Sequence, residues 1–189
     1  EMGGARRPHQ RAAAGALGQP WRGAVRHVHR PAGRPDLATE PAGAAGDMLL
    51  GSLLELGLAP QKLEKDLKTL AVAPFKLCVT KVQKKGLAGT ALRVESLGEK
   101  HFRHLPQITN IIKKSSLSGW VKERSLKAFN RLAQAEAKVH GLPLEKVHLH
   151  EVGALDTIID ICGFFWALEQ LAVDKVLASP LPAGRGWIN

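Results

Sequence analysis

Cysteine is scarce in this 189-residue sequence, which contains only Cys78 and Cys162, far apart and each within an apolar stretch. Two such thiols make no disulfide framework, agree with a reducing cytoplasm, and are expected to be buried and free. Long apolar runs are also missing, because the longest, such as ICGFFWAL, fall far short of the roughly 18 residues that a membrane helix requires. The beginning of the sequence lacks the apolar core of a secretory signal. These absences argue against secreted and membrane-spanning classes and predict a cytoplasmic protein.

Several catalytic signatures are absent as well. The sequence has no GxxxxGKS or GxxxxGKT phosphate loop, and neither the HExxH nor the CxxC spacing of zinc sites. No Ser or Cys accompanies a His and an acid in a recognisable nucleophile signature, and no internal repeat is present. Any chemistry must therefore come from a less common arrangement of polar residues.

Residues 1–42 differ in composition from the rest of the chain, since they contain no Lys, Ile or Phe but are rich in Arg, Ala, Gly and Pro. Such a segment cannot bury enough apolar surface to offset its ordering entropy, so we expect disorder over 1–42 and a single domain over 43–189. A nucleic-acid-binding basic tail, a targeting peptide or a misassigned start are the alternatives. Nucleic acid is the less favoured partner, because Trp21 is the segment's one aromatic residue and the net charge of +10 is not gathered in one place.

From Gly43 onward the patterns become regular. Asp47 is expected to cap a helix over MLLGSLLELG, and Pro60 to open one over PQKLEKDLKTLA. Alternation around KKGLAG predicts an antiparallel hairpin near residues 75–97, with a bulge where the alternation slips. Further helices are expected over LPQITNIIKKSS, WVKERSLKAFNRLAQAEAKVHG with Gly141 as its cap, and the apolar ALDTIIDICGFFWALEQLAV, before a short strand in DKVLASPLP. The fold class is therefore α/β or α+β, a helix-rich domain with a small sheet that includes a β-hairpin.

The densest cluster of potential ligands is VHLHEVGALDTIID, which contains His148, His150, Glu151, Asp156 and Asp160. In an extended segment His148 and His150 point to one side, which is a chelating arrangement. Asp156 and Asp160 follow one helical turn apart, where a divalent cation or a distant basic side chain would relieve their repulsion. The alternative is a solvated loop followed by an acid that the helix dipole stabilises. Imidazole and carboxylate suit nickel, zinc or iron about equally, so the residue types do not choose the metal.

Two further loops are candidates for binding an anion. In PAGAAGDMLLG, Gly46 and Asp47 precede or open a helix whose free backbone N–H groups could meet a phosphate, although a plain turn and cap is the alternative. In SPLPAGRG, Arg185 could contact an anion, and an ordinary surface loop is the alternative.

Three segments, GDMLLGSLLELG, HLHEVGALDTIIDI and VLASPLPAGRG, occur in an order and spacing that resembles the LarC family of nickel-insertion proteins over about residues 43–189. The resemblance implies a CTP-dependent enzyme of the lyase class that inserts nickel into a pyridinium bisthiocarboxylate mononucleotide, forming the nickel pincer cofactor of lactate racemase and related enzymes. It strengthens a nickel-binding role for the HLHEVGALDTIID residues and a nucleotide- or substrate-binding role for Gly46, Asp47 and Arg185. It singles out no catalytic residue.

The sequence also departs from the family pattern. The family normally has a short apolar strand and an acidic residue ahead of Gly-Asp-Met, where this chain has RPDLATEPAGAA, so we expect the opening strand to be missing or replaced. The resemblance further implies an incomplete, N-terminal part of the protein, inactive alone, whose partners are nickel, the mononucleotide and a C-terminal nucleotide-binding domain. A homo-oligomer stays open. A non-catalytic nickel store or chaperone and a nucleic-acid-binding protein built on the basic tail remain the alternative functions.

Overall fold

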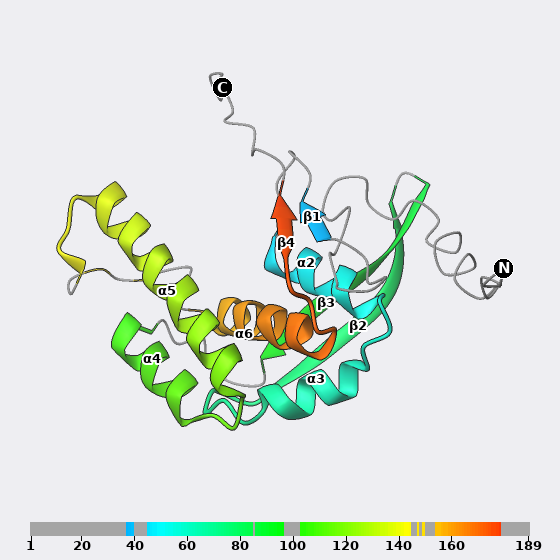
Figure 1. Cartoon of the computed structure of the whole chain (residues 1–189), viewed down its shortest axis with the longest axis horizontal. Helices are drawn as coiled ribbons and strands as arrows, with labels where there is room; N and C mark the ends of the chain where they lie inside the picture. The colour runs from blue at the N-terminus through cyan, green and yellow to red at the C-terminus, as the bar shows by residue number, and fades with distance from the viewer. Residues whose placement is uncertain are drawn as a thin grey trace, which may run out of the picture.

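The computed structural model describes residues 37–39, 45–84, 86–96, 103–144, 147, 149 and 154–178. These residues form five helices and four strands, in agreement with the expected helix-rich class (Figure 1). Their order is β1 (Leu37–Thr39), α2 (Gly46–Leu54), α3 (Pro60–Leu67), β2 (Phe75–Lys84), β3 (Leu87–Ser96), α4 (Leu105–Lys114), α5 (Gly119–His140), α6 (Leu155–Gln170) and β4 (Val176–Ala178).

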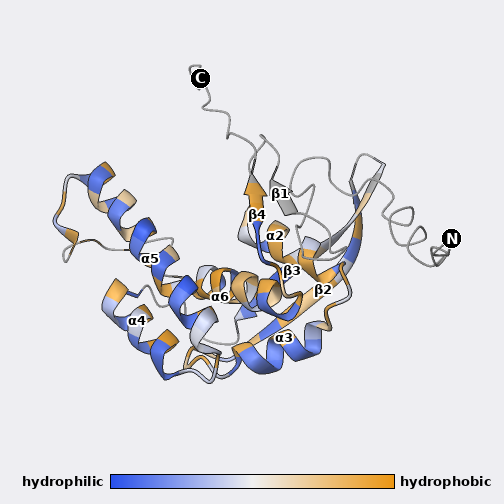
Figure 2. Cartoon of the chain, in the orientation of Figure 1, coloured by the Kyte–Doolittle hydropathy of each residue, from blue (hydrophilic) through white to orange (hydrophobic). Residues whose placement is uncertain are grey.

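Helix α6 lies at the centre of the fold, with α2, α3 and α5 packed against it (Figure 1). Its side chains Ile158, Ile159, Cys162 and Trp166 are buried, as the nearly continuous apolar pattern predicts. Figure 2 shows the matching outward pattern, with hydrophilic residues over the exposed side of α3 and hydrophobic residues along α6. The described residues contain no helix that is both long and apolar enough to cross a membrane.

The predicted hairpin is confirmed, but the predicted bulge is wrong. Strands β2 and β3 pair without interruption from Phe75 opposite Ser96 to Lys84 opposite Leu87. Phe75 is buried in the core, whereas Thr80, Lys81 and Gln83, nearer the turn, are exposed, so burial there no longer enforces a strict alternation of apolar residues. Gly86, with φ +80°, supplies the left-handed conformation that a two-residue hairpin loop requires.

The predicted ends of two helices are confirmed by the structure. Pro60 opens α3, where its missing N–H costs nothing, and Gly141 ends α5 with φ +64°. The Oγ of Ser118 caps the other end of α5 by accepting the N–H of Val121. These local rules therefore place α3 and α5 correctly.

Strand β1 pairs in parallel with β4, so that Leu37 lies opposite Val176 and Thr39 opposite Ala178. The short strand expected in DKVLASPLP is thus confirmed. An opening strand also exists where we expected it to be missing or replaced, and its sequence is LAT. These three residues fall inside the range 1–42 that we expected to be disordered. They form a strand because pairing with β4, far along the chain, satisfies their backbone hydrogen-bonding groups, and composition cannot reveal such a partner. The rest of that range lies outside the described residues.

Two N-terminal deletions are expected to differ in thermal stability. Removing residues 1–36 should leave the melting temperature nearly unchanged, because this segment has few apolar residues to contribute to a core. Removing 1–42 also removes β1 and leaves β4 unpaired, and should lower the melting temperature by about 2–5 °C. Circular dichroism melts of the two variants would check this, and an equal loss in both would contradict the proposed boundary.

Candidate functional site

Asp160 on α6 lies directly against Gly46, the first residue of α2. A Cβ atom added to Gly46 would lie 2.7 Å from both the Cβ and the Oδ2 of Asp160, so only glycine permits this approach. The backbone N–H of Asp47 donates a hydrogen bond to the same carboxyl group. The end of α2 that we predicted to bind an anion therefore already holds a carboxylate of the protein itself.

Three acidic side chains interact at this point. Burial in the first place, and then the carboxylates of Asp47 and Asp156, raise the pKa of Asp160 to about 7, and only the N–H of Asp47 acts to lower it. The Oδ1 of Asp160 is buried and has no hydrogen-bond partner within the described part of the chain. No described Lys or Arg offsets these charges at Asp160. Such a group favours the arrival of a proton or a cation.

Asp47 and Asp156 are both exposed and lie in the first turns of α2 and α6, respectively. The prediction that Asp47 caps α2 is wrong, because the helix begins at Gly46, two residues before the predicted start at Met48, and Ala45 occupies the cap position. The Oδ1 of Asp47 instead accepts the N–H of Met48 at 2.8 Å. Asp156 lies as expected, and its Oδ1 accepts the N–H of Thr157 at 2.8 Å. Both carboxylates therefore lie at the N-terminal ends of their helices, where the helix dipole is positive.

Four of the predicted site residues, His148, His150, Glu151 and Arg185, lie outside the described residues. Val147, directly before His148, and Leu149, between the two histidines, are buried and anchor the chain in the core at those two positions. Among the described residues, no group of three or more His, Cys, Asp or Glu side chains is placed to hold a metal ion. Asp47, Asp156 and Asp160 therefore do not form a complete metal site by themselves.

The contact between Asp160 and α2 could not be found from the sequence. Spacing along the helix paired Asp160 with Asp156, whereas the structure adds Gly46 and Asp47 from a segment more than a hundred residues earlier. The one indication in the sequence that these segments meet was that both carry motifs that resemble the same protein family. The two motifs meet in space and bring Asp47, Asp156 and Asp160 together in one acidic site, hereafter the Asp47–Asp160 site.

Comparison with known proteins agrees with the resemblance. The family model described as "Nickel insertion protein" matches residues 37–189. A "Pyridinium-3,5-bisthiocarboxylic acid mononucleotide nickel insertion protein" of Staphylococcus epidermidis is 46% identical over 148 residues, which cover 78% of this chain and 38% of the relative. The protein of the same name from Desulfitobacterium hafniense is 44% identical over 148 residues, covering 78% and 37%. The chain thus spans less than two fifths of these relatives' length. No solved structure matches it.

Proposed function

Because the chain belongs to the nickel-insertion protein family, we propose that residues 37–189 form the nickel-handling part of a protein that inserts nickel into a pyridinium-3,5-bisthiocarboxylic acid mononucleotide. The observation that carries this proposal is the half-buried Asp160 carboxyl group, which lies against α2 and close to two more carboxylates. Its Oδ1 atom is buried and lacks a hydrogen-bond partner among the described residues. A divalent cation would offset that charge. Nickel is here the substrate that is delivered.

We assign the remaining nickel ligands to the HLHE segment. His148, His150 and Glu151 precede α6, the helix that carries Asp160, so the four residues come from one continuous stretch. Imidazole nitrogen together with carboxylate oxygen is a ligand set that suits nickel. Arg185 remains a candidate for contact with an anionic group of the mononucleotide, whereas Asp160 already occupies the N-terminus of α2 at Gly46 and Asp47.

This ligand set favours delivery of the metal over its retention. Carboxylate and imidazole are harder ligands than the sulfur of a thiocarboxylate, and soft sulfur ligands compete well for a late transition metal. Nickel held by the acidic site would therefore pass to the sulfur atoms of the substrate, and no protein cysteine is required. The dependence on CTP and the cytoplasmic location that we expected from the sequence remain part of the proposal, and we assign CTP to no residue of this chain.

Replacing both His150 and Glu151 with Ala should weaken nickel binding by about tenfold or more, because two ligands are lost from the shell. Helical content should stay nearly unchanged, since both residues precede α6. Calorimetry with nickel and circular dichroism would check these two results. The same substitutions in a family member of full length should reduce nickel insertion in parallel.

The pair His140 and Glu136 offers a matched control. These two side chains are 3.2 Å apart on α5, and their replacement with Ala removes the same residue types from another part of the chain. Nickel affinity should not change in this control. An unchanged affinity in the His150 and Glu151 variant, or an equal loss in both variants, would remove the HLHE segment from the nickel site.

A further inference from the structure

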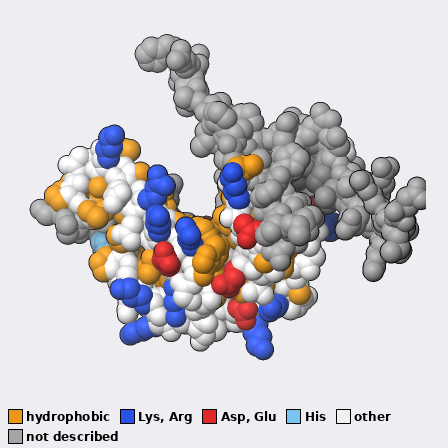
Figure 3. Space-filling view, viewed as in Figure 1, with side chains coloured by type: hydrophobic (Ala, Val, Ile, Leu, Met, Phe, Trp, Pro, Cys, Tyr) orange, Lys and Arg blue, Asp and Glu red, His pale blue; other side chains and the backbone are white. Residues whose placement is uncertain are grey.

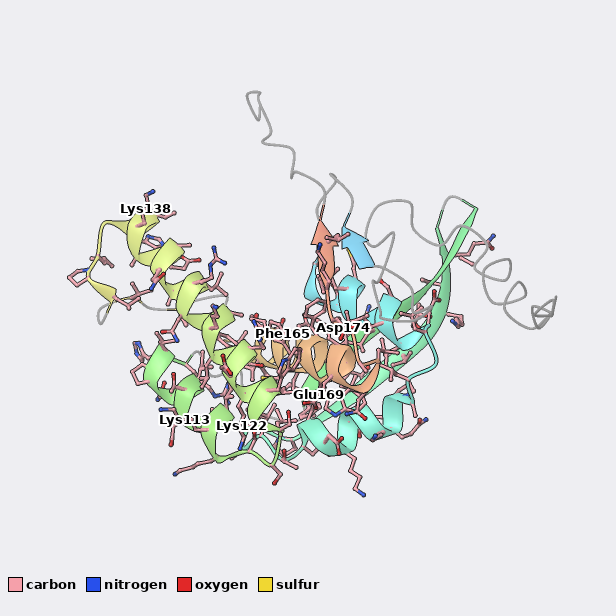
Figure 4. All side chains as sticks on the ribbon, in the orientation of Figure 1. Lys113, Lys122, Lys138, Phe165, Glu169 and Asp174 are labelled. Carbon is pink, nitrogen blue, oxygen red and sulfur yellow. The ribbon has the colours of Figure 1, made fainter. Side chains whose placement is uncertain are left out.

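Cationic side chains form a row along one face of α5. Arg124, Lys127, Arg131 and Lys138 are spaced by three, four and seven residues, which at 3.6 residues per turn places them on one side of the helix. All four are exposed. Figure 3 shows Lys and Arg side chains following α5 along one side of a hollow, and Figure 4 places Lys138 near the outer end of this helix. Helix α6 forms the base of the space between α5 and β4 (Figure 1).

The row forms no ion pairs in the part of the chain that the structure describes. Glu136, on another side of the helix, pairs with His140 instead. Like charges three or four residues apart on a helix repel one another and reduce its stability. A bound anion would remove that cost, so the row is suited to an anionic ligand.

Aromatic side chains lie at the inner end of the row. Trp120 is 38% exposed, the guanidinium of Arg124 lies 5.6 Å from its ring centre, and Phe165 of α6 meets it edge to face at 6.2 Å. Figure 4 shows Phe165 on α6 beside the start of α5. An aromatic surface of this kind is attractive to a cationic aromatic ring such as a pyridinium. Cationic side chains and an aromatic surface formed by Trp120 and Phe165 therefore lie together at the start of α5.

The substrate named for the relatives combines these same features. A pyridinium bisthiocarboxylic acid mononucleotide has one cationic ring, two thiocarboxylates and one phosphate, for a net charge of about −3 at neutral pH. The Asp47–Asp160 site repels such an anion until nickel is bound there. Cations elsewhere on the protein are thus needed to bring the substrate to the metal.

We propose, on the basis of the function proposed above, that Arg124, Lys127 and Arg131 bind the phosphate and thiocarboxylate groups of the mononucleotide, with its ring beside Trp120 and Phe165. Arg124 and Arg131 are about 10 Å apart along the helix axis, which is comparable with the length of a mononucleotide. Phe165 and Asp160 are five residues apart on α6, about 7.5 Å along its axis. The two places therefore lie little more than one turn apart along α6, on the sides that face α5 and α2, respectively.

The test replaces Arg124, Lys127 and Arg131 together with Gln and measures binding of nicotinate mononucleotide, a pyridinium mononucleotide with one carboxylate, by calorimetry. Because three charge contacts are lost together, the triple variant should bind about tenfold more weakly or worse. Raising the salt concentration should weaken binding to the unaltered chain. A matched control replaces three exposed lysines on other elements, Lys65, Lys113 and Lys114, with Gln and should stay within about twofold.

Three results would overturn the assignment to α5: an equal loss in the control, no loss in the triple variant, or no binding of the mononucleotide by the unaltered chain at millimolar concentration. Much tighter binding of a single-stranded oligonucleotide would also overturn it, by identifying the row as a nucleic-acid surface. Nickel affinity, measured in the same variants, should not depend on Arg124, Lys127 or Arg131. If the unaltered chain did not bind nickel, that result would instead contradict the proposed function. The mononucleotide measurement could still be interpreted independently.

Discussion

Replacing Asp160 with Asn is expected to stabilise the protein at pH 8 and to weaken its binding of nickel. In the folded protein the pKa of Asp160 is raised to about 7, whereas a carboxyl in the unfolded chain titrates near 4. The folded state therefore holds the proton more tightly, and its stability falls as the pH rises from about 4 through about 7. The loss amounts to something on the order of 2–4 kcal/mol above pH 7, and the Asn variant avoids it because its amide does not ionise.

Urea unfolding at pH 5 and pH 8 would measure this effect. The free energy of unfolding of the unaltered chain should drop more between the two pH values than that of Asp160→Asn. The variant Asp156→Asn is the control, because it removes a neighbouring carboxyl that is exposed, and it should reduce the drop only in part. Parallel pH profiles for all three proteins would show that Asp160 is not held in its protonated form by the fold.

Nickel should reverse the pH effect in the unaltered chain. A divalent cation at the Oδ1 of Asp160 favours the ionised carboxylate, so binding should release a proton near neutral pH and raise the melting temperature most at pH 8. The Asn variant, which lacks the charge, should gain less from nickel. A combination of higher intrinsic stability and lower nickel affinity is the pattern of a residue kept for function at a cost in stability.

Replacing Gly51 with Ala is expected to destabilise the fold by about 2–4 kcal/mol. Helix α2 crosses β3 so closely that a Cβ at Gly51 would lie 2.5 Å from the carbonyl oxygen of Thr90. That oxygen belongs to the backbone of a paired strand and cannot rotate away. Polar contacts hold the two elements together, because Glu55, the residue after α2, accepts a hydrogen bond from the Oγ1 of Thr90 at 2.6 Å and pairs with the Nζ of Lys81 at 2.9 Å.

Gly119→Ala is the matched control for this prediction. Gly119 is the first residue of α5, and an added Cβ would meet nothing within 4 Å. Because Ala favours a helix over Gly by up to about 1 kcal/mol, the control should be neutral or slightly stabilising. Denaturant unfolding would compare the two variants. A Gly51→Ala protein as stable as the unaltered chain would mean that α2 and β3 can separate at no cost.

Much of the local structure can be predicted from the sequence alone, because periodicity and helix ends depend on neighbouring residues. The 3.6-residue pattern of α5, its end at Gly141, the N1 proline of α3 and the alternation of the β2–β3 hairpin all predicted their elements. The motifs around Gly46 and Asp160 were likewise enough to suggest the family that the comparisons confirm. The roles of His148, His150, Glu151 and Arg185 remain predictions.

Tertiary structure alone decided which distant segments meet. The pairing of β1 with β4, the approach of Asp160 to Gly46 and the crossing of α2 over β3 at Gly51 each join residues that the chain keeps far apart. Nothing in the spacing of residues within one helix specifies its neighbours, since these depend on how the buried faces of all the elements pack together. The same limit explains why the raised pKa of Asp160 was not foreseen. Its two largest causes, burial and the carboxylate of Asp47, exist only once α2 has packed against α6.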